Sequence, residues 1–176
     1  MGLEPEVMCG SQPEDIINTI YGHVKNGFKF NSEEPLSHKT EDYISDPLLS
    51  DQAFCLVYVV DANLVQTLNE KLTDKLCIIR TRCSEKRIPQ VIVMTKVDLV
   101  CPLVSKDLRK IYTSKKIREK MQVCSDKIGV PMNHIFPVKN YSEEIDTDDD
   151  ADVLILKALD QIVNLANDRL RDAASN

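Results

Sequence analysis

The chain has 176 residues, of which 43% are hydrophobic and 28% are charged, and its formal net charge is −6. The length predicts a single domain over residues 1–176, and the composition argues against wholesale disorder or a fibrous repeat. The negative charge argues against a nucleic-acid or anionic-membrane partner, because such partners attract clustered Lys and Arg. No apolar run approaches the length of a membrane span, so we expect a cytoplasmic protein without a membrane anchor helix.

The sequence offers no metal or catalytic constellation. None of its six cysteines forms a CxxC pair or a Cys/His metal spacing, so we expect free thiols in a reducing compartment. The acidic run beginning at Asp146 does not fit a calcium loop, because Ala151 and Lys157 stand where that loop needs Gly and Glu. The sequence therefore predicts no catalytic residue and no metal site.

The first predicted element is an amphipathic helix over residues 11–25. Ser11 and Glu14 have the spacing of a capping box, Pro13 stands in the first turn, and apolar residues recur on one face. Residues 26–50 are polar and weakly periodic, so they predict an irregular surface segment.

Three strand–helix units are predicted over residues 53–170. The apolar run 53–62 predicts a buried strand ending near Asp61, and apolar residues every three or four positions predict a long helix over 64–87. The run VIVMT predicts a second buried strand at 91–95.

The second strand is followed by a predicted helix over 105–128, in one or two pieces, which Gly129 closes. A third short strand at 134–138 precedes a final helix whose apolar face begins at Ile155. Repeated strand–helix units with nearly continuous apolar strands predict an α/β fold with a parallel sheet and flanking helices.

Polar residues follow the second and third strands, where ligands bind in open parallel sheets. The second strand runs into TKVD, with Thr95, Lys96 and Asp98, and the third runs into PVKN, with Val138 and Lys139. The Asp98 carboxylate can accept two hydrogen bonds from guanine N1–H and N2–H, while the Lys96 stem can lie along the base. The backbone N–H of Val138 can meet guanine O6. We therefore predict a guanine-base site at this edge. In the plainer interpretation, Asp98 caps the next helical turn, Lys96 is solvated, and TKVD is a coincidence on an α/β scaffold.

TKVD and PVKN resemble the fourth and fifth guanine-recognition motifs of Ras-like GTPases. Together with FKFN, EDYISDPLLSDQAFCLVYVVDA and PVKNYSEE, they make nearly the whole chain resemble the C-terminal half of the interferon-induced protein 44 and 44-like family. The resemblance implies an incomplete Ras-like fold of the P-loop NTPase type that lacks the P-loop half. It also implies an interferon-induced, antiviral or immune function through protein contacts.

The phosphate side of a GTPase site is not recognisable in this sequence, because it contains no GxxxxGK[ST]. On the family pattern, Met1-Gly2-Leu3-Glu4 matches the tail of a D-x-x-G segment, and Gly2 would face the γ-phosphate. We therefore expect Met1 to be an internal methionine of a longer protein. Phosphate contacts carry most of a nucleotide's binding energy in this fold class. We expect at most weak guanine-nucleotide binding by this chain, no hydrolysis, and GTP or GDP with Mg²⁺ as cofactors only in a longer form.

Two alternatives stay open at this stage. The chain acts through an unknown protein partner, or it is a fragment of an active GTP-binding GTPase whose P-loop lies upstream of Met1. In the second case the missing N-terminal half is the partner.

Overall fold

The computed structural model describes residues 12–31 and 35–175. The chain divides into two compact units. Unit 1 comprises Met1–Leu56, Asn69–Pro89 and Asn167–Asn176, and unit 2 comprises Val57–Leu68 and Gln90–Ala166. That the whole chain forms one domain stays a prediction.

Helix α1 of unit 1 spans Pro13–Ile20, so it is shorter than the helix predicted over residues 11–25. Its N-cap is Gln12, whose side chain makes no capping hydrogen bond, and the predicted capping box at Ser11 lies outside the described residues. The helix starts at Pro13 because a proline at the first helical position needs no N–H partner and has a suitable φ.

Gly22 ends the α1 region. Its φ of +84° is in the left-handed region, and an added Cβ would lie 2.9 Å from the backbone of Asp51, so only glycine fits. Val24 therefore does not continue the helical face and instead forms an isolated antiparallel bridge with Tyr43.

Helix α2 spans Glu70–Glu85 and is shorter than the helix predicted over residues 64–87. The preceding residues Val65–Thr67 form a separate 3₁₀ turn. The Asn69 side chain accepts a hydrogen bond of 2.8 Å from the N–H of Leu72, and this cap sets the start of the helix.

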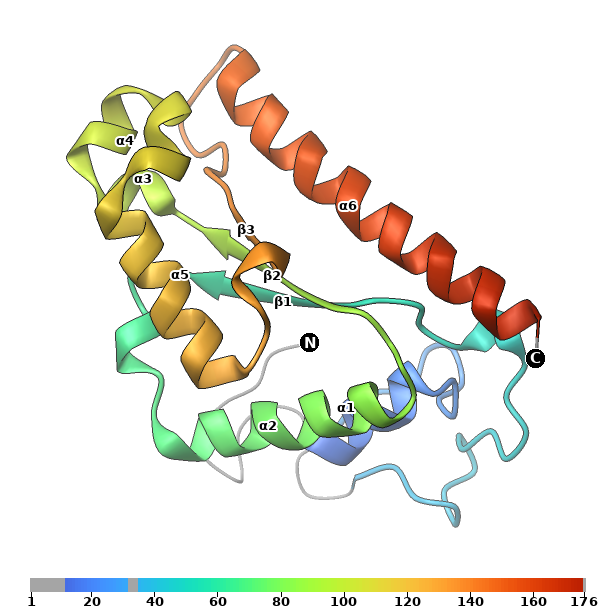
Figure 1. Cartoon of the computed structure of the whole chain (residues 1–176). Helices are drawn as coiled ribbons and strands as arrows, with labels where there is room; N and C mark the ends of the chain where they lie inside the picture. The colour runs from blue at the N-terminus through green and yellow to red at the C-terminus, as the bar shows by residue number, and fades with distance from the viewer. Residues whose placement is uncertain (1–11, 32–34, 176) are drawn as a thin grey trace. The chain divides into compact units, whose positions relative to one another are not determined.

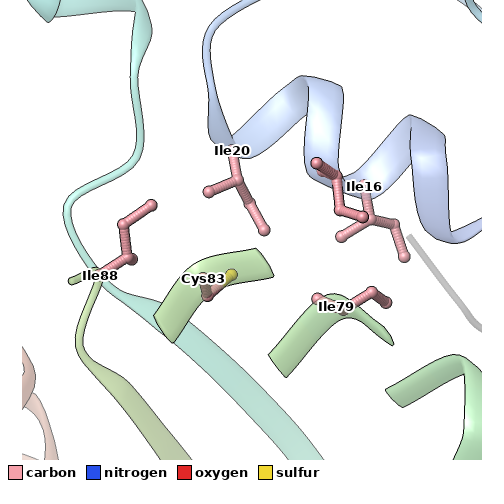
Figure 2. Close-up of a cluster of buried hydrophobic side chains, with 6 residues drawn as sticks. Ile16, Ile20, Ile79, Cys83 and Ile88 are labelled. Carbon is pink, nitrogen blue, oxygen red and sulfur yellow. The ribbon is translucent and has the colours of Figure 1, made fainter. Parts of the chain in front are cut away.

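An apolar cluster between α1 and α2 holds unit 1 together. Figure 2 shows Ile16 and Ile20 of α1 facing Ile79 and Cys83 of α2, with Ile88 beside them. All five side chains are buried. Complete burial of one such aliphatic side chain is worth about 1.5–3 kcal/mol, so this cluster contributes substantially to the stability of the unit.

The sheet has three strands in the order β1-β2-β3: β1 (Leu56–Asp61), β2 (Gln90–Thr95) and β3 (Ile135–Pro137). β2 and β3 are parallel. The N–H of Leu56 donates to the carbonyl of Pro89 (2.9 Å) and that of Ala62 to Thr95 (3.0 Å), so β1 runs in the same direction. In Figure 1, β1 and β2 lie side by side with their arrowheads pointing to the same edge.

In unit 2, several helices lie between β2 and β3 in the sequence. α3 (Val97–Val100) and α4 (Pro102–Lys106) are short, a 3₁₀ helix covers Leu108–Thr113, and α5 spans Lys115–Ile128. The predicted helix over 105–128 is therefore divided more than expected. Ser114 begins α5 as its N-cap, and Gly129, at φ +82°, closes it as predicted.

The last helix, α6, spans Asp149–Ala174. None of the helices in the described ranges has the length and apolarity needed to cross a membrane. The predicted fold class is confirmed: the chain has mixed α/β structure with a three-stranded parallel sheet and flanking helices, as in part of a Ras-like fold.

Candidate functional site

The structure gathers the predicted base-binding residues at one edge of unit 2. Thr95 is the last residue of β2 and Lys96 and Asp98 follow it, while Val138 and Lys139 follow the carboxyl end of β3. Because β2 and β3 are neighbours and parallel, both groups emerge on the same side of the sheet.

Asp98 lies in the first turn of α3 and is partly buried. Among residues 12–31 and 35–175, no hydrogen-bond partner of its carboxylate is found. The N-cap of α3 is Lys96, which adopts a left-handed conformation with φ +58°, so Asp98 does not cap this turn as the plainer interpretation held. The conformation of Lys96 costs about 1–2 kcal/mol for a residue with a Cβ, and such strain is typical of functional sites.

Lys96 is paired rather than simply solvated. Its Nζ lies 2.9 Å from Oδ2 of Asp61, the last residue of β1. Burial raises the pKa of Asp61, but the bonds from Lys96 and from the backbone and side chain of Asn63 outweigh it, and the net pKa is lowered. Asp61 therefore stays ionised and fixes the Lys96 ammonium group beside β1.

Lys139 forms the second ion pair of the edge. Its Nζ lies 2.7 Å from Oε1 of Glu144; Lys139 is partly buried, and Glu144 lies in an exposed loop. The hydrogen bond from Lys139, with the backbone N–H groups of Ser142 and Glu143, lowers the pKa of Glu144 to about 2. The pKa of Lys139 is raised, chiefly by Glu144 and to a smaller degree by Asp98.

The predicted contact between the Val138 N–H and guanine O6 stays a prediction, although this N–H already has a partner in the structure. That N–H donates to the carbonyl of Met94 at 2.8 Å, so it extends the β2–β3 ladder. Thr95 is similarly committed to the sheet, because its hydroxyl donates to the carbonyl of Val60 at 3.3 Å. These two residues position the edge, while Asp98, Lys96 and Lys139 supply its functional groups.

Gly2, predicted for the phosphate side, lies outside the described residues. Sequence reasoning did not foresee Glu144, which lies in a loop with no periodic pattern. It noted Asp61 only as a strand-end residue. The signal for its pairing with Lys96 was that Asp61 ends β1 and Lys96 directly follows β2, the neighbouring strand.

The edge carries three carboxylates, from Asp61, Asp98 and Glu144, and two ammonium groups, from Lys96 and Lys139. It therefore has a small negative excess. Such an edge suits a neutral base with N–H donors better than a polyphosphate, which needs a positive cradle. In the described part of the chain, no group of three or more His, Cys, Asp or Glu side chains is arranged to hold a metal ion.

The parallel sheet and its flanking helices place the chain in the α/β class, and their arrangement is consistent with part of a Ras-like fold. Comparison with known proteins is more specific. The chain is 29% identical over 168 residues to interferon-induced protein 44 of Mus musculus, which is 96% of this chain and 40% of the mouse protein. It is 31% identical over 159 residues to interferon-induced protein 44 of Homo sapiens, covering 90% of this chain and 36% of the human protein. It is 28% identical over 172 residues to human interferon-induced protein 44-like, covering 98% of this chain and 38% of that protein.

The resemblance drawn from the motifs is thereby confirmed: nearly the whole chain is similar to the C-terminal part of the interferon-induced protein 44 and 44-like proteins. The chain spans less than half the length of these relatives. No family model matches the chain. No solved structure matches it either.

Proposed function

We propose that the chain is an interferon-induced, GTPase-like protein of the antiviral or immune response that acts through protein contacts in the cytoplasm and binds guanine nucleotides weakly. The word interferon-induced comes from the names of its relatives. The base-binding part of the proposal depends on the edge formed by TKVD and Lys139.

The observation that carries the nucleotide part is the Asp98 carboxylate. It is partly buried, lacks a hydrogen-bond partner among the described residues, and follows a buried parallel strand. Guanine presents two parallel N–H donors at N1 and N2, and a carboxylate can accept both; adenine has no such pair. An unpartnered acceptor at this position therefore favours guanine over adenine.

Exposed apolar side chains on α6 support the part of the proposal that concerns protein contacts. Val153, Leu156, Leu159 and Val163 are each about half exposed or more, and they recur every three or four residues on the helix. Exposed apolar side chains that form a continuous patch, rather than being scattered singly, are typical of protein interaction surfaces.

A second candidate function is guanine-nucleotide hydrolysis, with the phosphate-binding residues and Mg²⁺ supplied by protein outside this sequence. It is favoured by the relatives being much longer than the matched region, which is 36–40% of their length. In that case GTP or GDP with Mg²⁺ is the cofactor of the longer protein, and the edge described above contributes only base selection.

The base-selection proposal is tested by saturation-transfer NMR with GMP, AMP and XMP on the full chain. Wild type should favour GMP over AMP. Asp98→Asn should shift the preference toward XMP, because an amide can accept from N1–H and donate to the 2-oxo group of xanthine. A change of about tenfold in relative affinity is expected for one exchanged charge-assisted pair. The matched control is Asp168→Asn, at a residue 75% exposed on α6. Equal signals from GMP and AMP in wild type would contradict guanine recognition.

A further inference from the structure

Unit 1 contains two cavities that share two cationic residues. The first, of about 240 Å³, and the second, of about 480 Å³, are both lined by Lys86 and Arg169. Every residue that lines either cavity belongs to unit 1. The shared residues place positive charge where the two cavities adjoin.

The first cavity has an apolar and aromatic wall. Pro47, Ala53, Phe54 and Ile88 line it together with Tyr21. The Tyr21 hydroxyl donates to the carbonyl of Arg82 at 2.8 Å. A ligand in this cavity would therefore contact the Tyr21 ring rather than its hydroxyl. Sites for drug-sized ligands measure about 300–1,000 Å³. A cavity of about 240 Å³ therefore suits one aromatic ring rather than a whole nucleotide.

The cations around the cavities are not neutralised by ion pairs. Within the described part of the chain, Lys86, Arg87 and Arg169 form no ion pair with a carboxylate. Lys86 instead lies over the Tyr21 ring, 5.7 Å from its centroid, and Arg169 is partly buried. A partly buried guanidinium group without a carboxylate partner is costly, and a bound anion would remove that cost.

Two carboxylates also line the second cavity, but they do not cancel this charge. Glu85 lies 3.6 Å from Arg82, which takes part in neither cavity. Asp172 is the other acidic residue. Three cations thus stand against two acids; Glu85 has Arg82 as its partner, and Asp172 also has a partner within the structure.

The conformation of Arg87 adds a second observation. Its φ of +55° is in the left-handed region, directly after Lys86 ends α2. Glycine is the usual residue at such a helix end because any Cβ is strained there. An arginine held in this conformation at the rim of a cavity is consistent with a binding role.

We propose that the two cavities together bind a small aromatic phosphate monoester. The phosphate lies where Lys86, Arg87 and Arg169 meet, and the ring lies against Tyr21 and Phe54 in the first cavity. This site is separate from the guanine-base edge and does not depend on the proposed function.

A purely structural role for the same cations is the competing explanation. Lys86 and Arg87 follow the C-terminus of α2, and Arg169 is near the C-terminus of α6. Cations at these ends stabilise a helix by complementing its dipole. That role alters stability but requires no ligand, so binding and stability measurements separate the two.

The test is isothermal titration of the full chain with phenyl phosphate, inorganic phosphate and phenol at constant ionic strength. Phenyl phosphate should bind more tightly than either fragment. Arg169→Gln should weaken phenyl phosphate by about tenfold, the usual effect of losing one charge-assisted contact. The matched control is Arg171→Gln, which changes the same charge on the same helix at a residue that lines neither cavity. Absence of saturable binding by wild type, or equal weakening by both variants, would overturn the proposal.

Arg87→Gly gives a second, independent readout. Removing the strained Cβ should raise the Tm by about 2–4 °C while weakening phenyl phosphate. A higher Tm with unchanged affinity would exclude Arg87 from the site and contradict the proposed phosphate position. Because none of these probes contains guanine, their failure would leave the proposal for Asp98 untouched.

Discussion

Glu144 holds Lys139 through a 2.7 Å ion pair at the carboxyl end of the sheet, where Asp98 also lies. The pKa of Glu144 is lowered from 4.5 to about 2. A depressed carboxylate pKa contributes stability that is present above the unfolded value and is lost as the pH falls through the folded value. The contribution of Glu144 is therefore complete above pH 4.5 and disappears as the pH falls toward about 2.

The Lys139 side of the pair has the opposite sign. Its pKa is raised above 10.5, so its contribution is present below pH 10.5 and is lost as the pH rises through the raised value. Side-chain carbonyl NMR of Glu144 should show a midpoint near pH 2 in wild type. Lys139→Gln should return the midpoint toward 4.5, because the largest cause of the shift is removed. A wild-type midpoint near 4.5 would show that the pair does not form.

The site was predictable from sequence only at the level of which residues follow which strands. Thr95, Lys96, Asp98, Val138 and Lys139 were brought to one edge because parallel strands end on the same side. Hydrogen-bond partners were not predictable. The Val138 N–H joins the β ladder and Lys96 pairs with Asp61, because these partners become neighbours only when the sheet has formed.

At the scale of secondary-structure elements, the packing of α1 on α2 is the feature most open to mutation. Ile79→Ala removes a side chain that is 1% exposed, and the lost burial plus the cavity should cost about 2–5 kcal/mol. The neighbouring Ile78 is 45% exposed, so Ile78→Ala is the matched control and should change stability by about 0.5 kcal/mol or less. Urea unfolding measures both. Similar losses from the two variants would contradict the packing in Figure 2.

The order of strands and helices was predictable, but the helix ends were not. Apolar periodicity identified the runs that became β1, α2, β2, α5, β3 and α6. The missed ends are set by local chemistry: the left-handed Gly22 after α1, the Asn69 cap before α2 and the Ser114 cap before α5. Periodicity cannot detect these ends, because polar residues that cap a helix also occur within helices.

At the scale of the whole molecule, we expect the β1 side of the sheet to influence behaviour in solution. Among the described residues, β1 is the outer strand on one side of the sheet, which has the order β1-β2-β3, and its Val59 is 71% exposed. Unpaired apolar edges favour strand pairing between molecules. We expect the purified chain to self-associate or to require a partner strand.

Val59→Lys should reduce this self-association, because a charge on an edge strand opposes pairing with another chain. The measurement is size-exclusion chromatography with light scattering at several concentrations. The matched control is Leu103→Lys, which places the same charge at an apolar residue 63% exposed on α4. Val93→Lys is unsuitable as a control because β2 is the central strand of the sheet. A wild-type chain that is a monodisperse monomer would contradict the role assigned to this edge.

The most direct test concerns the carboxyl end of the sheet, where Asp98, Lys96 and Lys139 lie. Isothermal titration of the 176-residue chain with GTP and GDP, each with and without Mg²⁺, shows whether this end recognises a base without a phosphate cradle. In the proposed function, Asp98, Lys96 and Lys139 contact the base, and this end of the sheet carries a small negative excess. GTP and GDP should therefore bind weakly, with nearly equal affinity and no dependence on Mg²⁺, because phosphates and Mg²⁺ add little where no cradle holds them. Submicromolar, Mg²⁺-dependent binding of GTP would contradict this, since it requires a phosphate site within the chain.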